Sequence, residues 1–241
     1  MKVAVISDVH GNLEALEAVL ADLERERPAR IVCLGDFVGY GASPNECIER
    51  LRPKIEAAVV GNHDCAAIGR LRLTYFNADA AEAARWTDVR LTPENREYLL
   101  GLPYEIRETR ARFVHASPAE PEGWHYVLSP HDAAFEMEHF GEDVCFIGHS
   151  HYAGTFERGA GGVRYTRDPE LEFAAGRRYL VNVGSIGQPR DGDPRAAYAL
   201  FDLAEGWLRH VRVEYDIQAS AQRIFDADLA LNFGKRLFLG V

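Results

Sequence analysis

Short, almost continuously apolar runs that stop at polar residues recur along the 241-residue chain. Such runs are typical of strands buried on both faces, and they lack the alternation of a strand with one solvated face. The runs, each with its polar ending, are VAVIS-DVH (3–10), RIVCLG-D (30–36), AAVVG-NHD (57–64), RFV-H (112–115), VCFIG-HSH (144–151) and YLVN-VGS (179–185).

Helical patterns lie between several of these runs. After the first run, apolar side chains at 13, 16, 19, 20 and 23 fall on one face of a helix. Ser43, Thr92 and Ser129 each precede a proline, as helix N-caps often do, and Ser43 also has the spacing of a capping box. Gly141 is expected to end the helix that starts at Ser129. A last helix is expected over about 217–232.

The order of these elements predicts the fold class. Strand, helix and strand within the first 60 residues indicate βαβ units with right-handed crossovers. The segments VRYTR, AAYALFDL and LRHVRVEYD follow one another with short turns, so the second half is richer in sheet. Without a repeat or a linker to divide it, the chain is predicted to form a single α/β domain, 1–241, of layered sheets covered by helices.

Composition and charge limit the partners. The net charge of −10 and the pI of about 5.4 argue against nonspecific binding to nucleic acid or a membrane surface. No secretory signal is evident, and no stretch approaches the ~18 apolar residues of a membrane span. Four scattered cysteines without a CxxC motif indicate buried free thiols in a reducing compartment. A cytoplasmic protein is therefore expected.

Side chains suited to metal binding or catalysis stand at the ends of five predicted strands. In open α/β sheets ligands bind beyond the carboxyl ends of the strands, where the loops converge. Taken singly, each motif has an ordinary interpretation as a helix cap, a turn or a satisfied buried histidine. Together they predict a metal site whose candidate ligands are Asp8, His10, Asp36, Asn62, His115, His149 and His151, with His63 at the same strand ends.

The chemistry of this set indicates the kind of metal. Imidazole, carboxylate and amide oxygen without thiolate suit Mn²⁺, Fe²⁺, Zn²⁺ or Ni²⁺. A structural zinc site would be richer in cysteine. Seven candidate ligands exceed what one ion with open positions needs, whereas two ions ~3.5–4 Å apart, a recurrent arrangement in phosphate-ester hydrolysis, would use them all.

The ordered motifs DVHGN, GDFVGYG, GNHD, VHASP and GHSH resemble those of the calcineurin-like metallophosphoesterase superfamily. The segment NVGSIGQPRDGDPRAAYAL (182–200) extends the resemblance. This segment and GYG are similar to the small prokaryotic branch grouped with diadenosine tetraphosphatases and Mn²⁺-dependent phosphodiesterases. The resemblance implies a four-layer αββα sandwich of two mixed β-sheets flanked by helices.

The resemblance also implies roles for individual residues. Two divalent ions would be bound, with Mn²⁺ preferred to Fe²⁺, Zn²⁺ or Ni²⁺. The first would be held by Asp8, His10 and His151, and the second by Asn62, His115 and His149, with Asp36 bridging both. In that family a hydroxide between the ions attacks phosphorus in line with the leaving oxygen. His63 is not a ligand in the family pattern; it is implied to stabilise transition-state charge or to protonate the leaving oxygen. Asp64 would hold the His63 ring in orientation.

Two further features concern the substrate. Arg190 follows GQP in a loop expected near the site, where it would bind a nonbridging or distal phosphate; a solvated surface arginine is the alternative. The segment at about 70–107, which includes Trp86, would form a small helical lid over the site.

Two classes of function remain open. The first is an enzyme acting on a phosphodiester, a phosphomonoester or a dinucleoside polyphosphate, with a small phosphorylated molecule such as a nucleotide as its partner. The second is a catalytically silent scaffold, as in a retromer subunit of the same fold that has lost part of its ligand set. All ligands and His63 are present here, which favours the enzyme. Gly39-Tyr40-Gly41 replaces the arginine of the GDxVDRG motif of protein phosphatases, and the acidic charge disfavours a DNA-repair nuclease.

Overall fold

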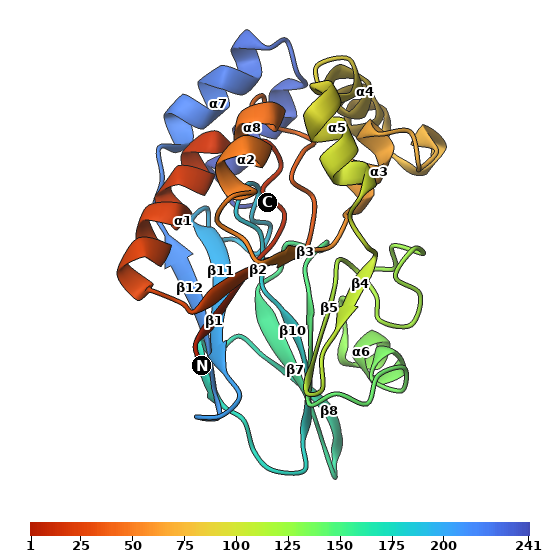
Figure 1. Cartoon of the computed structure of the whole chain (residues 1–241), viewed down its shortest axis with the longest axis vertical. Coiled ribbons are helices and arrows are strands. Elements are labelled where there is room, and N and C mark those ends of the chain that lie inside the picture. Colours follow the sequence, from red (N-terminus) through yellow and green to blue (C-terminus); the bar gives the residue numbers. More distant parts are fainter.

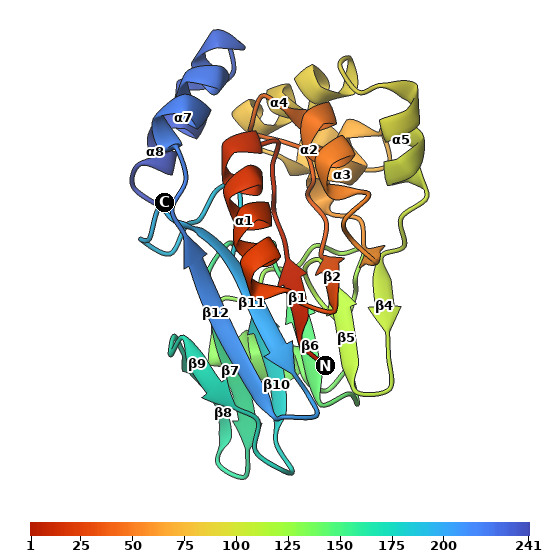
Figure 2. The ribbon, with the colours of Figure 1, turned by 60° about the vertical axis from the view of Figure 1, so that its left-hand side comes forward.

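Two six-stranded mixed β-sheets pack face to face in the computed structural model, which describes residues 1–241 (Figures 1 and 2). Sheet A has the strand order β3-β2-β1-β11-β12-β9, and sheet B has the order β4-β5-β6-β10-β7-β8. The strands are β1 (Val3–Ile6), β2 (Arg30–Cys33), β3 (Ala57–Ala58), β4 (Glu105–Arg107), β5 (Ala111–Val114), β6 (Val144–Ile147), β7 (Gly154–Gly159), β8 (Gly162–Thr166), β9 (Glu170–Glu172), β10 (Arg178–Asn182), β11 (Ala196–Asp202) and β12 (Trp207–Val213).

Helices cover both outer faces and gather at one end of the sheets (Figure 1). No helix is both long enough and apolar enough to cross a membrane. The helices are α1 (Leu13–Glu26), α2 (Pro44–Leu51), α3 (Asn62–Ala67), the 3₁₀ turn η1 (Leu73–Tyr75), α4 (Ala78–Asp88), α5 (Pro93–Leu100), α6 (Pro130–Glu136), α7 (Ile217–Asp226) and α8 (Leu231–Leu237).

The layers follow from strands that are apolar on both faces. In β1, Val3 and Val5 pack with Phe113 and Phe146 in the core between the sheets. The alternate side chains of β1 face α1, α2 and α5 in a second core, and the outer face of sheet B packs on α6 in a third. The predicted four-layer sandwich is confirmed, and the four cysteines are buried and free, as predicted.

The helix starts were predicted better than the helix ends. The Thr92 and Ser129 hydroxyls accept the N–H of the residue three positions on, whereas the Ser43 side chain caps nothing. Helix α6 ends at Glu136 and does not run on towards Gly141.

The prediction of one continuous helix over 217–232 was wrong, because the chain breaks between α7 and α8. Asp228 adopts a left-handed conformation (φ 55°) and donates its N–H to Phe225 O at 3.1 Å, and Leu229 donates to Ile224 O at 3.2 Å. This is a Schellman ending, in which the left-handed position is taken by Asp instead of the usual Gly, and Leu229 is buried behind it. The turn folds α8 back so that it packs against α7 and Tyr40.

Candidate metal centre and active site

The predicted ligands lie in loops that leave the strands through left-handed backbone conformations. Non-glycine residues seldom have positive φ, and Asp, Asn and His are the types that tolerate it best. Hydrogen bonds between loops hold this backbone, such as Asp8 N–H to Gly35 O at 3.0 Å and His10 N–H to Asp36 O at 2.9 Å. The ligands with positive φ are Asp8 (56°), His10 (50°), Asp36 (53°), His149 (63°) and His151 (63°).

These loops bring imidazole nitrogens and carboxylate oxygens together at the carboxyl ends of the strands. His151 Nε2 lies 3.2 Å from Asp8 Oδ1 and 3.1 Å from His10 Nε2. On the other side, His115 Nε2 lies 3.3 Å from Asp36 Oδ2. His10 Nε2 is 3.6 Å from both carboxylates, so the two groups of side chains are contiguous.

Three of the histidines have their tautomer fixed by the backbone. Each donates Nδ1–H to a carbonyl oxygen, which leaves the Nε2 lone pair directed at the other ligands, the usual arrangement of a metal-binding histidine. The acceptors are Val38 O for His10 (3.1 Å), Leu34 O for His115 (2.8 Å) and Gln188 O for His151 (2.5 Å). His149 is held the other way round, with Nε2 at 3.0 Å from Trp124 O, so its Nδ1 is the available ligand atom.

Each carboxylate has one oxygen satisfied and one without a donor. Asp8 Oδ2 accepts the His149 N–H at 3.1 Å, and Asp36 Oδ1 accepts the His63 N–H at 2.8 Å. Asp8 Oδ1 and Asp36 Oδ2 are buried without any hydrogen-bond partner. Leaving buried charged oxygens unpaired is costly, and they face nitrogen lone pairs. A divalent cation would neutralise these oxygens and accept the nitrogen lone pairs, so the residues present fit the implied metal.

The pKa of His115 reflects the negative charge of these carboxylates, whereas burial dominates the pKa of His151. Burial lowers the pKa of His151 to about 4, and the nearby Arg190 charge acts in the same direction. At His115 burial also acts to lower the pKa, but the Asp36 and Asp8 carboxylates outweigh it and raise the pKa to about 9. The two carboxylates therefore attract positive charge to the point where they meet.

The predicted site residues do come together. Asp8, His10 and His151 offer ligand atoms within 4.8 Å of one another, and so do Asp8, Asp36 and His115. Asn62 joins the second group, because its Oδ1 lies 3.1 Å from His115 Nε2. His149 lies beside it, with its ring centroid 5.1 Å from that of His115.

His63 lies at the edge of this cluster, and its ring is held by aromatic neighbours. Its centroid is 4.3 Å from that of Tyr40, 4.9 Å from that of His10 and 5.0 Å from that of Phe76. Burial lowers its pKa well below the ordinary value, and its Nδ1 has no partner. Gly39 (φ 97°) passes so close that a Cβ there would lie 2.6 Å from His63 Nδ1, which explains the glycine before Tyr40.

The predicted role of Asp64 was wrong, because its carboxylate does not reach the His63 ring. Its Oδ2 accepts the N–H of Asp36 at 2.8 Å and of Gly61 at 3.1 Å, and its Oδ1 accepts the N–H of Val38 at 3.2 Å. Asp64 therefore fixes the loop that carries Asp36. A polar run next to a metal ligand could not reveal which amides the carboxylate would meet.

Replacing Asp64 with alanine is expected to destabilise the fold by at least about 3 kcal/mol, because three buried N–H groups would lose their acceptor. Urea denaturation would measure the loss. The exposed Glu82→Ala on α4 is the control and should leave the free energy of unfolding within about 0.5 kcal/mol of the wild-type value. Equal stability of the two variants would contradict the role given to Asp64.

A pocket of about 490 Å³ opens beside the cluster. Asn62, His63 and His149 connect it to the site, and Phe76 and Asn77 come from the predicted lid segment, whereas Trp86 does not line it. Sequence reasoning missed its aromatic wall of Tyr40, Trp124 and Tyr126, of which only Tyr40 lay in a quoted motif. The full lining is Tyr40, Asn62, His63, Leu71, Tyr75, Phe76, Asn77, Ala80, Glu120, Glu122, Gly123, Trp124, Tyr126 and His149.

Arg190 is half-buried beside the same wall and is not a solvated surface side chain. Its guanidinium carbon lies 5.4 Å from the centroid of the Tyr40 ring. Its Nη2 donates to Gln188 Oε1 at 2.8 Å, and its backbone N–H donates to His151 O at 3.2 Å. The residue is thus attached to the loop of a predicted ligand.

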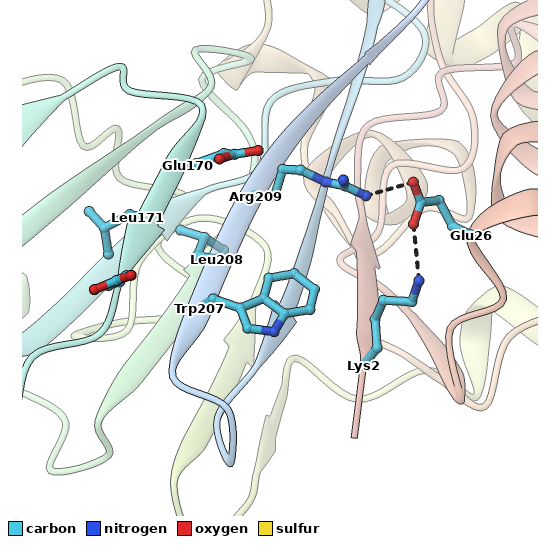
Figure 3. Close-up of a pocket in the computed structure, with 8 residues that line it drawn as sticks. Lys2, Glu26, Glu170, Leu171, Trp207, Leu208 and Arg209 are labelled. Carbon is cyan, nitrogen blue, oxygen red and sulfur yellow. Dashed lines mark hydrogen bonds and ion pairs between the residues drawn. The ribbon is translucent and has the colours of Figure 1, made fainter.

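A second hollow lies at the opposite end of the strands, between β9, β12 and the start of β1 (Figure 3). Both of its cations bind Glu26: Arg209 Nη2 at 2.6 Å and Lys2 Nζ at 3.0 Å. It contains no histidine or cysteine and no residue of the metal cluster. It therefore has no part in the site.

Candidate metal ligands at the carboxyl edge of two packed sheets, beside a pocket, are typical of metal-binding α/β proteins. The sequence matches the model of the calcineurin-like phosphoesterase superfamily domain over residues 1–206, and the chain belongs to this family.

Individual relatives agree with this assignment. An uncharacterized protein of Methanocaldococcus jannaschii is 42% identical over 99% of this chain and 98% of its own. The crystal structure of a metallophosphoesterase from Sphaerobacter thermophilus is 39% identical with a TM-score of 0.89, covering 100% of this chain and 99% of that one. A hypothetical protein from Pyrococcus horikoshii shares the fold at 22% identity, with a TM-score of 0.81 and coverage of 100% and 98%.

Proposed function

We propose that the protein is a phosphoesterase that uses two divalent ions to hydrolyse a small phosphorylated substrate. The observation that carries the proposal is the pair of buried, unpartnered oxygens, Asp8 Oδ1 and Asp36 Oδ2, facing the inward Nε2 atoms of three histidines. Membership of the superfamily and the adjoining pocket support it.

The two groups of side chains described above would each hold one ion. Asp8, His10 and His151 would hold the first; Asn62, His115 and His149 would hold the second; and Asp36 would contact both. Imidazole and oxygen ligands without thiolate suit Mn²⁺, Fe²⁺, Zn²⁺ or Ni²⁺. The resemblance of the motifs to those of Mn²⁺-dependent phosphodiesterases favours Mn²⁺. When bound, such ions supply Lewis-acid stabilisation of phosphoryl charge and lower the pKa of water.

His63 and the loops around it would act on the substrate directly. The place of its ring on the pocket wall suits a hydrogen bond from the imidazole to a phosphoryl oxygen or to the leaving oxygen. Tyr40 and Phe76 hold the ring and exclude water from one side of it. Asp64 keeps the Asp36 loop in place.

The pocket beside His63 would receive the part of the substrate that leaves. Its aromatic wall favours a flat or apolar group, as in an aryl ester or a nucleoside, and the segment at 70–107 would cover it as a lid. A phosphodiester, a phosphomonoester and a dinucleoside polyphosphate remain the candidate substrates, and a cytoplasmic protein would meet all three.

Hydrolysis assays separate this proposal from a silent scaffold. With Mn²⁺, we expect turnover of at least one member of a panel comprising an aryl phosphodiester, an aryl phosphomonoester, cyclic nucleotides and dinucleoside polyphosphates. Removal of metal with a chelator should abolish the turnover, and returning Mn²⁺ should restore it. A protein that hydrolyses nothing with any of the four metals would be the scaffold.

A further inference from the structure

We propose that Arg190 and Arg236 together bind a second anionic group of the substrate, a phosphate beyond the one that reacts. That the anion belongs to a substrate rests on the proposed function, whereas the anion site itself rests on the two arginines alone. Arg190 precedes β11, and Arg236 comes from α8, so the fold joins them from distant parts of the chain.

The two guanidinium groups share a single neutral acceptor. Gln188 Oε1 accepts from Arg190 Nη2 at 2.8 Å and from Arg236 Nη1 at 3.4 Å. No Asp or Glu oxygen lies within 4.0 Å of either group. Arg112 and Arg212, two other shielded arginines, are paired with the carboxylates of Glu105 and Asp191, and the half-buried Arg178 donates to two backbone carbonyls.

Two half-buried positive charges held next to each other repel, and their partial burial reduces the screening of this repulsion by solvent. Burial lowers the pKa of Arg236, and the Arg190 charge lowers it further. The neutral amide oxygen of Gln188 cannot neutralise the two guanidinium charges. A phosphate or phosphonate would, because its oxygens accept from several guanidinium N–H groups at once.

The position of the pair relates it to the metal centre. Arg190 is attached to the His151 loop and lies over Tyr40, whose ring contacts that of His63. Arg236 lies farther out and lines a hollow of about 600 Å³ together with Lys235, and Asn77 lines both this hollow and the pocket beside His63. Asp79 also lines the hollow, without reaching the guanidinium. A chain of anionic groups starting at the metals would therefore pass Arg190 before it reaches Arg236.

A purely structural role for Arg236 is poorly supported. Its only side-chain hydrogen bond is the one to Gln188, and 3.4 Å is beyond the range in which such bonds are strong. Helix α8 is anchored instead by the buried side chains of Phe233 and Leu237. Substituting Arg236 should accordingly leave the folded state intact.

Binding of matched ligands that cannot be hydrolysed tests the proposal. The probes are linear alkane bisphosphonates of increasing length and the alkylphosphonates of the same lengths, measured by calorimetry on the Mn²⁺-loaded protein. Wild type should bind one bisphosphonate length at least about tenfold more tightly than its monophosphonate. Arg236→Gln should remove this preference while leaving monophosphonate affinity within about twofold, and Arg85→Gln, an exposed arginine on α4 without ion pairs, should change neither.

The outcomes separate this site from the proposed function. Equal binding of the two probe series by wild type, or an unchanged preference in Arg236→Gln at an unchanged melting temperature, would overturn the anion site even if the protein hydrolyses phosphoesters. A preference that depends on Arg236 in a protein without hydrolytic activity would uphold the anion site and refute the phosphoesterase. An equal loss for both probe series would show that Arg236 acts on the reacting phosphate and not on a second one.

Discussion

Replacing Asp36 with alanine is expected to empty the metal centre and to reduce hydrolysis to the background rate, a loss of at least about 10⁴-fold. Asp36 Oδ2 lies 3.3 Å from His115 Nε2 and 3.6 Å from His10 Nε2 and has no donor, so it faces ligands of both groups. Without it, the remaining ligands carry a single negative charge, on Asp8. Elemental analysis after gel filtration and a Mn²⁺-dependent hydrolysis assay would measure the two effects.

Two variants show whether the effect is local. Asp36→Asn retains an oxygen that can accept the His63 N–H, so it should stay folded while it still loses metal. Asp143→Ala removes a carboxylate that pairs with Arg110 at the surface and should keep full metal content and activity. If Asp36→Ala retained two ions per chain, Asp36 would not be the shared ligand.

Replacing His63 with glutamine is expected to retain the metals but to lower kcat by about 10²- to 10⁴-fold. The ring lies on the pocket wall with its Nδ1 buried against Gly39, so its Nε2 would bind a phosphoryl or leaving oxygen. Its atoms also lie within reach of Asp36 and His10, so loss of metal in this variant would assign it to the ligands instead. Metal content and kcat must therefore be measured on the same preparation.

The leaving group separates the two roles open to His63. If the ring protonates the leaving oxygen, the loss should be larger for an alkyl than for a nitrophenyl ester, whereas stabilisation of phosphoryl charge predicts equal losses. His131→Gln, an exposed histidine at the start of α6, should behave like wild type. Near wild-type rates with both esters in His63→Gln would exclude a catalytic role.

The convergence of the candidate ligands was predictable because it depends mainly on short-range pattern. A buried strand that ends in Asp or His, as at Asp8 and His115, directs that side chain to the carboxyl edge of its sheet whatever the rest of the chain does. The strand layers were predictable for the same reason, since runs apolar on both faces need cover on both faces.

What depends on contacts between distant segments was not predictable. The acceptor role of Asp64 requires the Asp36 and Val38 amides to lie opposite it, and local sequence does not specify that. The pairing of Arg190 with Arg236 depends on the turn at Asp228, where a Schellman ending overrides a helical pattern that continues past it. Helix ends are decided by such turns, which the periodicity of apolar residues does not report.

The place of β1 in sheet A has a consequence for how the protein is made. β1 pairs with β2, which is synthesised soon after it, but its other edge pairs with β11, so that Ala4 lies opposite Leu200. The loop that bears Asp8 and His10 is therefore supported on one side only until most of the chain has left the ribosome. Contacts so distant in sequence form slowly and late in folding. Metal is thus expected to bind only once β11 has been synthesised. Nascent chains that end before β11 should bind none.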